Sequence, residues 1–298
     1  PFDLIVNLPL ELPVPPSISL CDEDMDGNVE FDLTIRIPAI LANANNPSNF
    51  TVEFFTSYAD AVAGDLSERI DTPESYWLST HVHTLGIRVT NNTTGCQSYT
   101  IMDIRRLPMP NVTDQPLAAI EGCQDPNSPD GIGTFDLTDK EDFIRQGDTN
   151  LVITYHLSEE EAQNGTNAIA TPDSYTTTST TIYIRVANPS NAGVSCAVIL
   201  SVELIIHPLP LIADTAFEVC EVGSTGYAEF YFPDFNADLL GPTQSLDDFN
   251  IAYYLSLADA ENQTGAISQS VPYSNTQQNA QPLWVRVTSI QTGCFVIE

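Results

Sequence analysis

The chain has 298 residues, the length of two or three ordinary domains, and its 40 Asp and Glu residues outweigh 9 Lys and Arg residues to give a formal charge of −31. Phosphate recognition needs clustered cations, so this balance argues against nucleic acid and anionic lipid as partners. Hydrophobic residues make up 42% of the chain, which excludes a disordered acidic tail. No run approaches the ~18 apolar residues of a membrane span, so we expect no membrane insertion.

The first segment, FDLIVNLPL from Phe2, matches two segments further along the chain: IMDIRRLPMP from Ile101 and VELIIHPLP from Val202. We interpret those two segments as the last strands of their repeats, each followed by a proline-rich junction. We therefore expect residues 1–8 to be the end of a preceding repeat.

Three copies of one pattern follow, with a period near one hundred residues. Each copy begins with a cysteine, an acidic or Gly-rich loop and a Phe, starting at Cys21, Cys123 and Cys220. An aromatic strand then runs into a helix-forming segment, and a further strand ends at a second cysteine. The recurring segments are VEFFTSYADA, ITYHLSEEEA and IAYYLSLADA for the aromatic strand, and IRVTNNTTGC, IRVANPSNAGVSC and VRVTSIQTGC for the second cysteine.

Proline-rich segments separate the copies, because proline removes ladder donors and stiffens a join. They predict repeat 1 over residues 9–108, repeat 2 over residues 109–208 and repeat 3 over residues 209–298, with the third cut in its last strand. We expect the chain to be part of a longer tandem array.

The short β-rich runs, separated by Asn, Gly, Pro and Ser clusters, predict an all-β fold. About seven strands in a hundred residues fit an immunoglobulin-like β-sandwich. Small helical turns are expected where helix formers cluster, as from Ser158. Phe54, Tyr155 and Tyr253 recur at one aligned position, which predicts a shared core.

Near-constant spacing of the six cysteines predicts one disulfide within each repeat: Cys21 with Cys96, Cys123 with Cys196, and Cys220 with Cys294. The separations are 75, 73 and 74 residues. Pairs of buried reduced thiols are the alternative, and zinc is disfavoured because no C-x-x-C spacing occurs. Disulfides of this kind persist in oxidising compartments.

The sharpest chemical motif is the run CDEDMDGNVE, which resembles a calcium loop. Carboxylates at alternate positions can converge on one hard cation, and glycine permits the sharp turn. The position that would be the bidentate acid of an EF-hand is Leu33, so only a calcium-bearing β-loop remains possible, with a solvated acidic loop as the alternative. The candidate ligands are Asp22, Asp24, Asp26, Asn28 and Glu30.

The later repeats carry weaker versions of this motif. Repeat 2 has a stretched form with Asp125, Asn127 and Asp130, and repeat 3 has CEVGSTG, which lacks the acidic ladder. A motif that loses its alternate acidic residues from one repeat to the next is more typical of loop stiffening than of catalysis. Calcium is the one cofactor that the sequence suggests.

No G-x-S-x-G, H-E-x-x-H, Walker loop or G-x-G-x-x-G motif occurs, so we expect no catalytic residues and no enzyme. Trp77 has no counterpart in the other repeats and is the aromatic residue to consider for stacking on a glycan or contacting a partner, although packing also accounts for it.

Taken together, the run from Cys21 to Thr34, the stretch from Gly165 to Tyr175, IYIRV from Ile182 and the T-G-C and P-L-P segments resemble the giant cell-surface repeat proteins of Bacteroidetes. In that family such repeats precede a gliding-motility-associated C-terminal domain. The resemblance implies export by the type IX secretion system, display at the cell surface, and partnership with the secretion and motility machinery.

The first functional hypothesis is therefore a structural or adhesive, non-catalytic segment of a cell-surface filament. It would contact an extracellular surface or polysaccharide and the neighbouring repeats of its own chain. The alternative is a set of carbohydrate-binding accessory repeats in a secreted polysaccharide-degrading protein.

Overall fold

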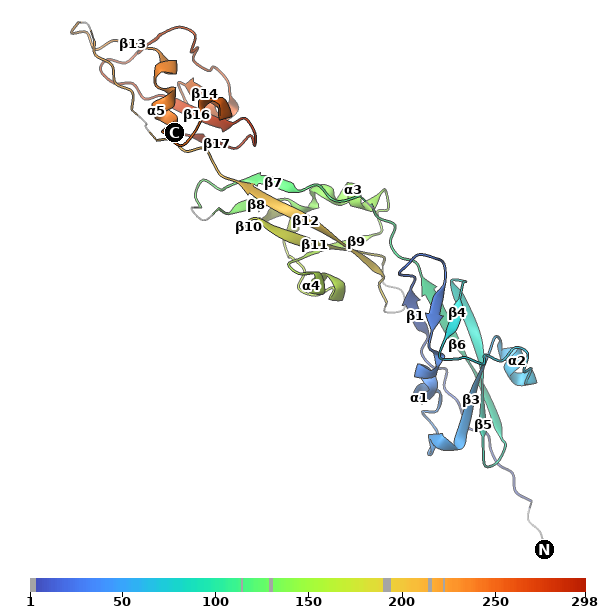
Figure 1. Ribbon diagram of the computed structural model, residues 1–298. Helices are drawn as coiled ribbons and strands as arrows, with labels where there is room; N and C mark the ends of the chain where they lie inside the picture. Colours follow the sequence, from blue (N-terminus) through green and yellow to red (C-terminus); the bar gives the residue numbers. More distant parts are fainter. Residues whose placement is uncertain (1–3, 114, 129–130, 190–193, 214–215, 222) are drawn as a thin grey trace. The chain divides into compact units, whose positions relative to one another are not determined.

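The structure is a computed structural model of the chain, and it describes residues 4–113, 115–128, 131–189, 194–213, 216–221 and 223–298 (Figure 1). The chain divides into two compact units. The first comprises residues 1–114, 142–153 and 185–199, and the second comprises residues 115–141, 154–184 and 200–298. Each unit therefore joins one outer repeat to a part of the middle repeat.

The first repeat forms a four-stranded sheet in the order β1-β6-β5-β3 and a two-stranded sheet of β2 and β4. β5 pairs antiparallel with both β3 and β6, whereas β1 runs parallel to β6. The elements are β1 (Ile18–Cys21), β2 (Val29–Phe31), η1 (Leu33–Arg36), α1 (Ile37–Ile40), η2 (Pro47–Asn49), β3 (Phe50–Phe55), α2 (Tyr58–Ala63), β4 (Tyr76–Leu78), β5 (Val82–Asn91) and β6 (Gln97–Leu107).

The second repeat has the same strand order, with a sheet β7-β12-β11-β9 and a pair of β8 and β10. β7 again runs parallel to the last strand, β12. The elements are β7 (Ile120–Cys123), β8 (Gly133–Phe135), η3 (Leu137–Lys140), α3 (Glu141–Arg145), β9 (Val152–His156), α4 (Glu159–Asn164), η4 (Pro172–Ser174), β10 (Tyr175–Thr177), β11 (Thr180–Ala187) and β12 (Ala197–His207).

The third repeat has a three-stranded sheet β14-β16-β17 and a pair of β13 and β15. No strand equivalent to β1 or β7 forms over the described residues before β13. The elements are β13 (Glu229–Phe230), η5 (Phe232–Asp234), α5 (Asn236–Leu240), η6 (Leu246–Asp248), β14 (Phe249–Tyr254), α6 (Leu257–Asn262), β15 (Tyr273–Ser274), β16 (Trp284–Ser289) and β17 (Phe295–Ile297). The chain is thus a tandem array of three immunoglobulin-like β-sandwich repeats.

Each repeat has its own core, built from the inward residues of its strands. The predicted core aromatics Phe54, Tyr155 and Tyr253 are 1–2% exposed, which confirms the prediction. In the first repeat the last strand completes the core, since Met102 and Ile104 of β6 are fully buried.

The predicted helical turn after each aromatic strand is also confirmed, as α2, α4 and α6. The hydroxyl oxygens of Ser57, Ser158 and Ser256 accept hydrogen bonds from the backbone N–H three residues later, at 3.1–3.2 Å. Serine at this position satisfies a backbone donor that a helix start leaves free. The S-x-x-[DE] signal therefore fixes the same turn in all three repeats.

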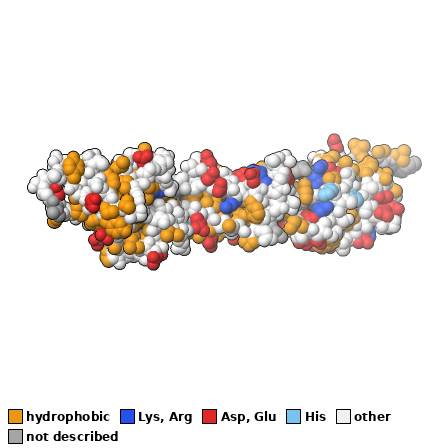
Figure 2. Space-filling model, turned by 90° about the horizontal axis from the view of Figure 1, so that it is seen from above, with side chains coloured by type: hydrophobic (Ala, Val, Ile, Leu, Met, Phe, Trp, Pro, Cys, Tyr) orange, Lys and Arg blue, Asp and Glu red, His pale blue; other side chains and the backbone are white. Residues whose placement is uncertain are grey.

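Acidic side chains are scattered over the face of the molecule in Figure 2, with few basic ones among them. No helix within the described ranges combines the length and apolar character that crossing a bilayer requires.

Candidate functional site

The site begins at the end of β1, where Cys21 lies opposite Leu107 in the parallel ladder with β6. The backbone N–H of Asp22 donates to the Leu107 carbonyl at 2.9 Å and extends this pairing by one step. The parallel ladder therefore carries Cys21 to the C-terminal end of the last strand of its own repeat.

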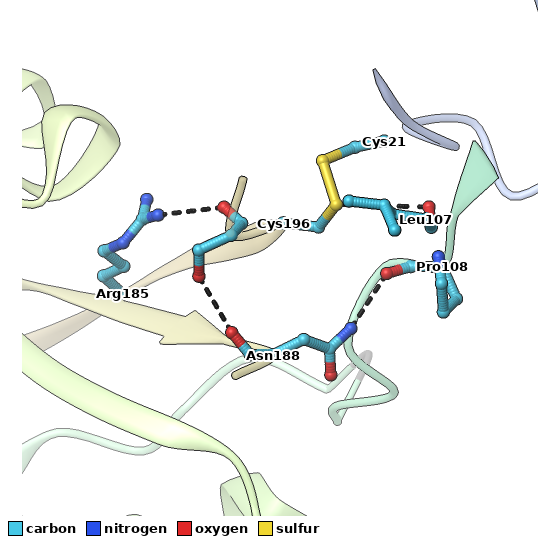
Figure 3. The surroundings of a disulfide bond; sticks show 7 residues. Cys21, Leu107, Pro108, Arg185, Asn188 and Cys196 are labelled. Atoms are coloured by element: carbon cyan, nitrogen blue, oxygen red, sulfur yellow. Dashed lines mark hydrogen bonds between the residues drawn. A yellow bond between two sulfur atoms is a disulfide. The ribbon is translucent and has the colours of Figure 1, made fainter. Parts of the chain in front are cut away.

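Cys196 of the second repeat lies beside the same strand end, with its Sγ 4.0 Å from the Leu107 carbonyl oxygen. The turn that precedes β12 holds Cys196 in place, since the N–H of Asn188 donates to the Cys196 carbonyl at 3.0 Å. The hydroxyl of Ser195 donates to the Asn188 carbonyl at 2.8 Å, and Arg185 donates to the Ser195 carbonyl at 3.2 Å (Figure 3). Cys196 is 3% exposed.

Cys21 and Cys196 form a disulfide with a Cα–Cα distance of 5.6 Å, within the normal range for such bonds. The Asn188 side chain donates to the Pro108 carbonyl at 2.8 Å, next to the disulfide (Figure 3). One covalent bond and one hydrogen bond thus join the end of the first repeat to the turn of the second.

A second disulfide repeats this arrangement one period later, between Cys123 and Cys294, with a Cα–Cα distance of 5.5 Å. Cys123 lies opposite His207 at the end of β12, and the N–H of Gln124 donates to the His207 carbonyl at 2.9 Å. The N–H of Ser289 donates to the Cys294 carbonyl at 2.8 Å, as Asn188 does for Cys196.

The predicted pairing within repeats is therefore wrong. Cys21 lies opposite the last residue of β6, whereas Cys96 immediately precedes the first. β6 has 11 residues, so the two cysteines lie about 33 Å apart at opposite ends of one strand. A disulfide cannot span that distance. Cys96 and Cys220 are free thiols, of which Cys96 is partly buried and Cys220 exposed.

The family model of the Flavobacterium inter-domain disulphide bond domain matches residues 17–110, 119–210 and 216–298. The chain belongs to this family. The geometry above accounts for the family's description, since both disulfides join the first cysteine of one repeat to the second cysteine of the next. A search of curated proteins found no match.

Several solved structures are similar to this chain at low scores. The I-band fragment I67–I69 from titin has a TM-score of 0.32 at 9% identity, covering 97% of this chain and 95% of that one. Domains 3–5 of Drosophila OTK give 0.25 at 7% identity, covering 98% and 96%. Human mucin-like protocadherin EC1-2 gives 0.22 at 12% identity, covering 54% and 86%. These scores are too low to carry an argument.

Disulfides of this kind indicate an oxidising compartment outside the cytosol. Tandem sandwiches joined in this way are typical of structural, non-catalytic chains, and the established partners of each repeat are its neighbours in the same chain.

The acidic loop follows Cys21 directly and gathers three of the five predicted calcium ligands. One carboxylate oxygen from each of Asp22, Asp24 and Asp26 lies within 4.8 Å of the others. Asp22 is 4% exposed, and its Oδ2 accepts from Arg106 at 2.5 Å and from the N–H of Gly27 at 3.2 Å. Its Oδ1 is buried and has no hydrogen-bond partner.

The other two predicted ligands have different surroundings. The N–H of Asn28 donates to Asp26 Oδ1 at 2.7 Å, which closes the loop. Glu30 lies on β2 and accepts a hydrogen bond from Ser75. The structure thus brings together the alternate aspartates but not Glu30.

In the second repeat, Asp125 accepts from the N–H of Asn127 at 2.8 Å, which forms a local turn. Asp130, the remaining candidate there, lies outside the described residues.

In the third repeat, the carboxylate that follows the first cysteine is hydrogen-bonded by donors of its own loop. Glu221 follows Cys220 and accepts from the hydroxyl and the N–H of Thr225, both at 2.6 Å, and from the N–H of Gly226 at 2.8 Å. These hydrogen bonds, that of the Thr225 hydroxyl first, lower the pKa of Glu221. The Glu221 carboxylate is thus partnered within its own loop, whereas Asp22 Oδ1 is not.

Trp77, the aromatic residue considered for ligand contact, lies on β4 opposite Glu30 and is 60% exposed. Its indole ring is therefore accessible to a partner.

Sequence reasoning missed Asn188 and Arg106, which position the disulfide and the acidic loop. Asn188 lies at the position of Asn91 in the first repeat and of Ser289 in the third, so the repeat alignment could have singled out its turn.

Peptide mapping without reduction tests the pairing. We expect peptides that link Cys21 to Cys196 and Cys123 to Cys294, and two alkylatable thiols, Cys96 and Cys220, after denaturation. Replacement of Cys196 by Ser should expose Cys21 as a third thiol, whereas Cys96→Ser should leave both links intact. A peptide linking Cys21 to Cys96 would contradict the structure.

Proposed function

We propose that this chain is a load-bearing, non-catalytic segment of a long adhesive filament at the cell surface, similar to the gliding adhesin SprB of flavobacteria and exported by the type IX secretion system. The observation that supports it is the staggered disulfide, which joins each repeat covalently to the next. The resemblance to Bacteroidetes surface repeats supplies the gliding and secretion context.

The two disulfide loops overlap, because Cys123 lies inside the loop closed by Cys21 and Cys196, and Cys196 lies inside the loop closed by Cys123 and Cys294. Every peptide bond between Cys21 and Cys294 is therefore bypassed by at least one disulfide. A single backbone break between these two cysteines therefore leaves the chain covalently connected, as does the unfolding of a repeat. A filament dragged along a surface under load benefits from this covalent redundancy.

Single-molecule stretching tests the load-bearing role. In the oxidised chain the shortest covalent path crosses both disulfides and contains about a third of the residues. With about 3.5 Å per extended residue, we expect a limiting extension of roughly 350 Å when oxidised and roughly 1,000 Å after reduction.

The matched control is Cys96→Ser, which should leave the oxidised extension unchanged, while Cys196→Ser lengthens it. Equal extensions before and after reduction would argue against disulfide links between the repeats.

We propose further that the loop from Asp22 to Asp26 binds a calcium ion that stiffens the junction. Asp22 Oδ1 is a buried carboxylate oxygen without a partner, and burial of such an atom costs free energy unless a donor or cation faces it. Asp24 and Asp26 supply further oxygens within reach of the same ion, and oxygen ligands are those that Ca²⁺ prefers. Because the loop begins next to Cys21, an ion there would order the disulfide-bearing strand end.

Calorimetry and thermal melting of the whole chain test the calcium site. At about one hundred times its Kd, calcium should stabilise the first repeat by ~2.7 kcal/mol, and chelator should remove the gain. Asp24→Asn and Asp26→Asn should abolish the effect. Glu23→Gln makes the same change of charge in the same loop and should preserve it; an equal loss in that variant, or no heat of binding in the wild type, would refute the site.

Carbohydrate binding is a second candidate function, favoured by the exposed indole of Trp77. Aromatic faces on rigid strands suit stacking against sugar rings. On a glycan array we expect saturable binding that Trp77→Ala weakens at least tenfold, whereas Tyr58→Ala, which removes another exposed aromatic ring, leaves it intact. The absence of any saturable glycan would remove this candidate.

A further inference from the structure

The outer face of the strand pair β2 and β4 carries an indole ring beside a carboxylate. Trp77 lies directly opposite Glu30 in the ladder, and both side chains are exposed, Trp77 to 60%. The neighbouring pair, Phe31 and Tyr76, packs on the core from the other face. Because side chains alternate along a strand, Trp77 and Glu30 lie side by side on the face that points away from the core.

The fold does not require a tryptophan at this position. In the second repeat the same place in the ladder is taken by Thr134 opposite Thr176. In the third repeat it is taken by Glu229 opposite Ser274. All of these side chains are exposed. Small polar residues opposite this strand therefore complete the same sheet in the other two repeats, so packing does not account for the large ring in the first.

The Glu30 carboxylate is held in place but not neutralised. The hydroxyl of Ser75, two residues before Trp77, donates to Glu30 Oε1. Glu30 Oε2 accepts no hydrogen bond from any described residue, and no described basic side chain pairs with Glu30. By contrast, Glu53 in the same repeat pairs with Arg88 at 2.9 Å. One oxygen of Glu30 is thus fixed, and the other is left to face a ligand beside the indole.

These two groups together select a cation. The face of an indole attracts a cation through the ring quadrupole, and a carboxylate pairs with the same charge. Cross-strand partners hold their Cβ atoms about 5 Å apart, so one ligand can reach both groups. A neutral ligand would cover the Glu30 carboxylate without replacing its water, which costs free energy. An acidic polysaccharide would be repelled by a chain of charge −31.

We propose that Trp77 and Glu30 bind a cationic polysaccharide, a polymer of glucosamine with free amines. The apolar face of a sugar ring stacks on the indole, and the ammonium group pairs with Glu30 Oε2. Both groups lie on an exposed face of a strand pair, which leaves room for a long polymer. This inference rests on the carbohydrate-binding function proposed above and names the class of sugar that the site takes.

Calorimetry on the whole oxidised chain tests the inference, at about 0.15 M salt to screen long-range attraction and at a pH that keeps the sugar amine charged. The probes are the β-linked hexamers of glucosamine, N-acetylglucosamine and glucose. These share the shape of the ring and differ in whether it carries a charged amine, an acetylated amine or a hydroxyl. We expect the glucosamine hexamer to bind about tenfold more tightly than the other two.

Three variants assign the binding to this face. Trp77→Thr introduces the residue that the second repeat carries at this position, so it should preserve the fold and weaken binding of the glucosamine hexamer about tenfold. Glu30→Gln keeps an acceptor for Ser75; it should weaken that binding about fivefold and lower the preference over N-acetylglucosamine by the same factor. The matched control is Glu229→Gln, which makes the same change of charge opposite Ser274 and should bind like the wild type.

The outcomes separate this inference from the carbohydrate-binding function. Equal binding of all three hexamers, lost in Trp77→Thr, would overturn the cationic class and leave carbohydrate binding in place. No binding of any hexamer would remove both. An equal loss in Glu229→Gln, or binding of hexalysine as tight as that of the glucosamine hexamer, would show a general attraction of cations to the acidic chain and would also overturn the proposal.

Discussion

The parallel pairing of the first strand of each repeat with its last strand is the constraint on which the rest of the array depends. It brings the first cysteine to the end of the last strand, where the chain leaves the repeat: Cys21 lies opposite Leu107, and Cys123 opposite His207. The second cysteine precedes the start of that strand, one strand length away. A first cysteine can therefore be bonded only by something that follows its own repeat, and the turn of the next repeat provides it. An antiparallel first strand would have removed this geometry.

Charge at the junction follows from the same constraint. Asp22 comes directly after Cys21, so the ladder buries its carboxylate beside the strand end, and a buried carboxylate needs a cation or donors. Arg106, next to Leu107 on β6, supplies the cation at 2.5 Å. In a chain with so few basic residues, this arginine lies at the junction itself. Glu221 in the third repeat meets the same need through Thr225 and Gly226 of its own loop. The carboxylate that follows the first cysteine is thus partnered by an arginine in the first repeat and by donors of its own loop in the third.

The sequence was sufficient to predict the repeats, the β-sandwich class, the shared aromatic core and the helical turns, because strand alternation, capping serines and aligned aromatics are local signals. The disulfide pairing failed for a physical reason. In a periodic chain, a constant spacing of Cys21 and Cys96 within repeats necessarily gives a near-constant spacing of Cys21 and Cys196 between repeats, here 175 and 171 residues for the two links. Spacing alone cannot distinguish the two schemes. The deciding fact is that the four-residue strand β1 runs parallel to β6, and tertiary pairing sets this direction.

The alternation of aspartates predicted the cluster at the candidate ion site. The position of Glu30 on β2 was not predicted, because it depended on where the strands begin and end.

Staggered links also change how the array responds to unfolding. A loop of about 175 residues lowers the entropy of the unfolded chain by an amount worth about 5 kcal/mol in the chain-entropy model. A disulfide within one repeat would stabilise that repeat alone, whereas each of these loops closes over the junction of two repeats. When one repeat unfolds, the disulfide still joins it to its neighbour, so the extension of the unfolded segment is limited by the covalent path through that disulfide. Because the two disulfide loops overlap over residues 123–196, both disulfides limit how far the middle repeat can extend. The array can therefore lose and regain individual sandwiches under load while its covalent path stays short, which is a property of the stagger and not of the sandwich fold.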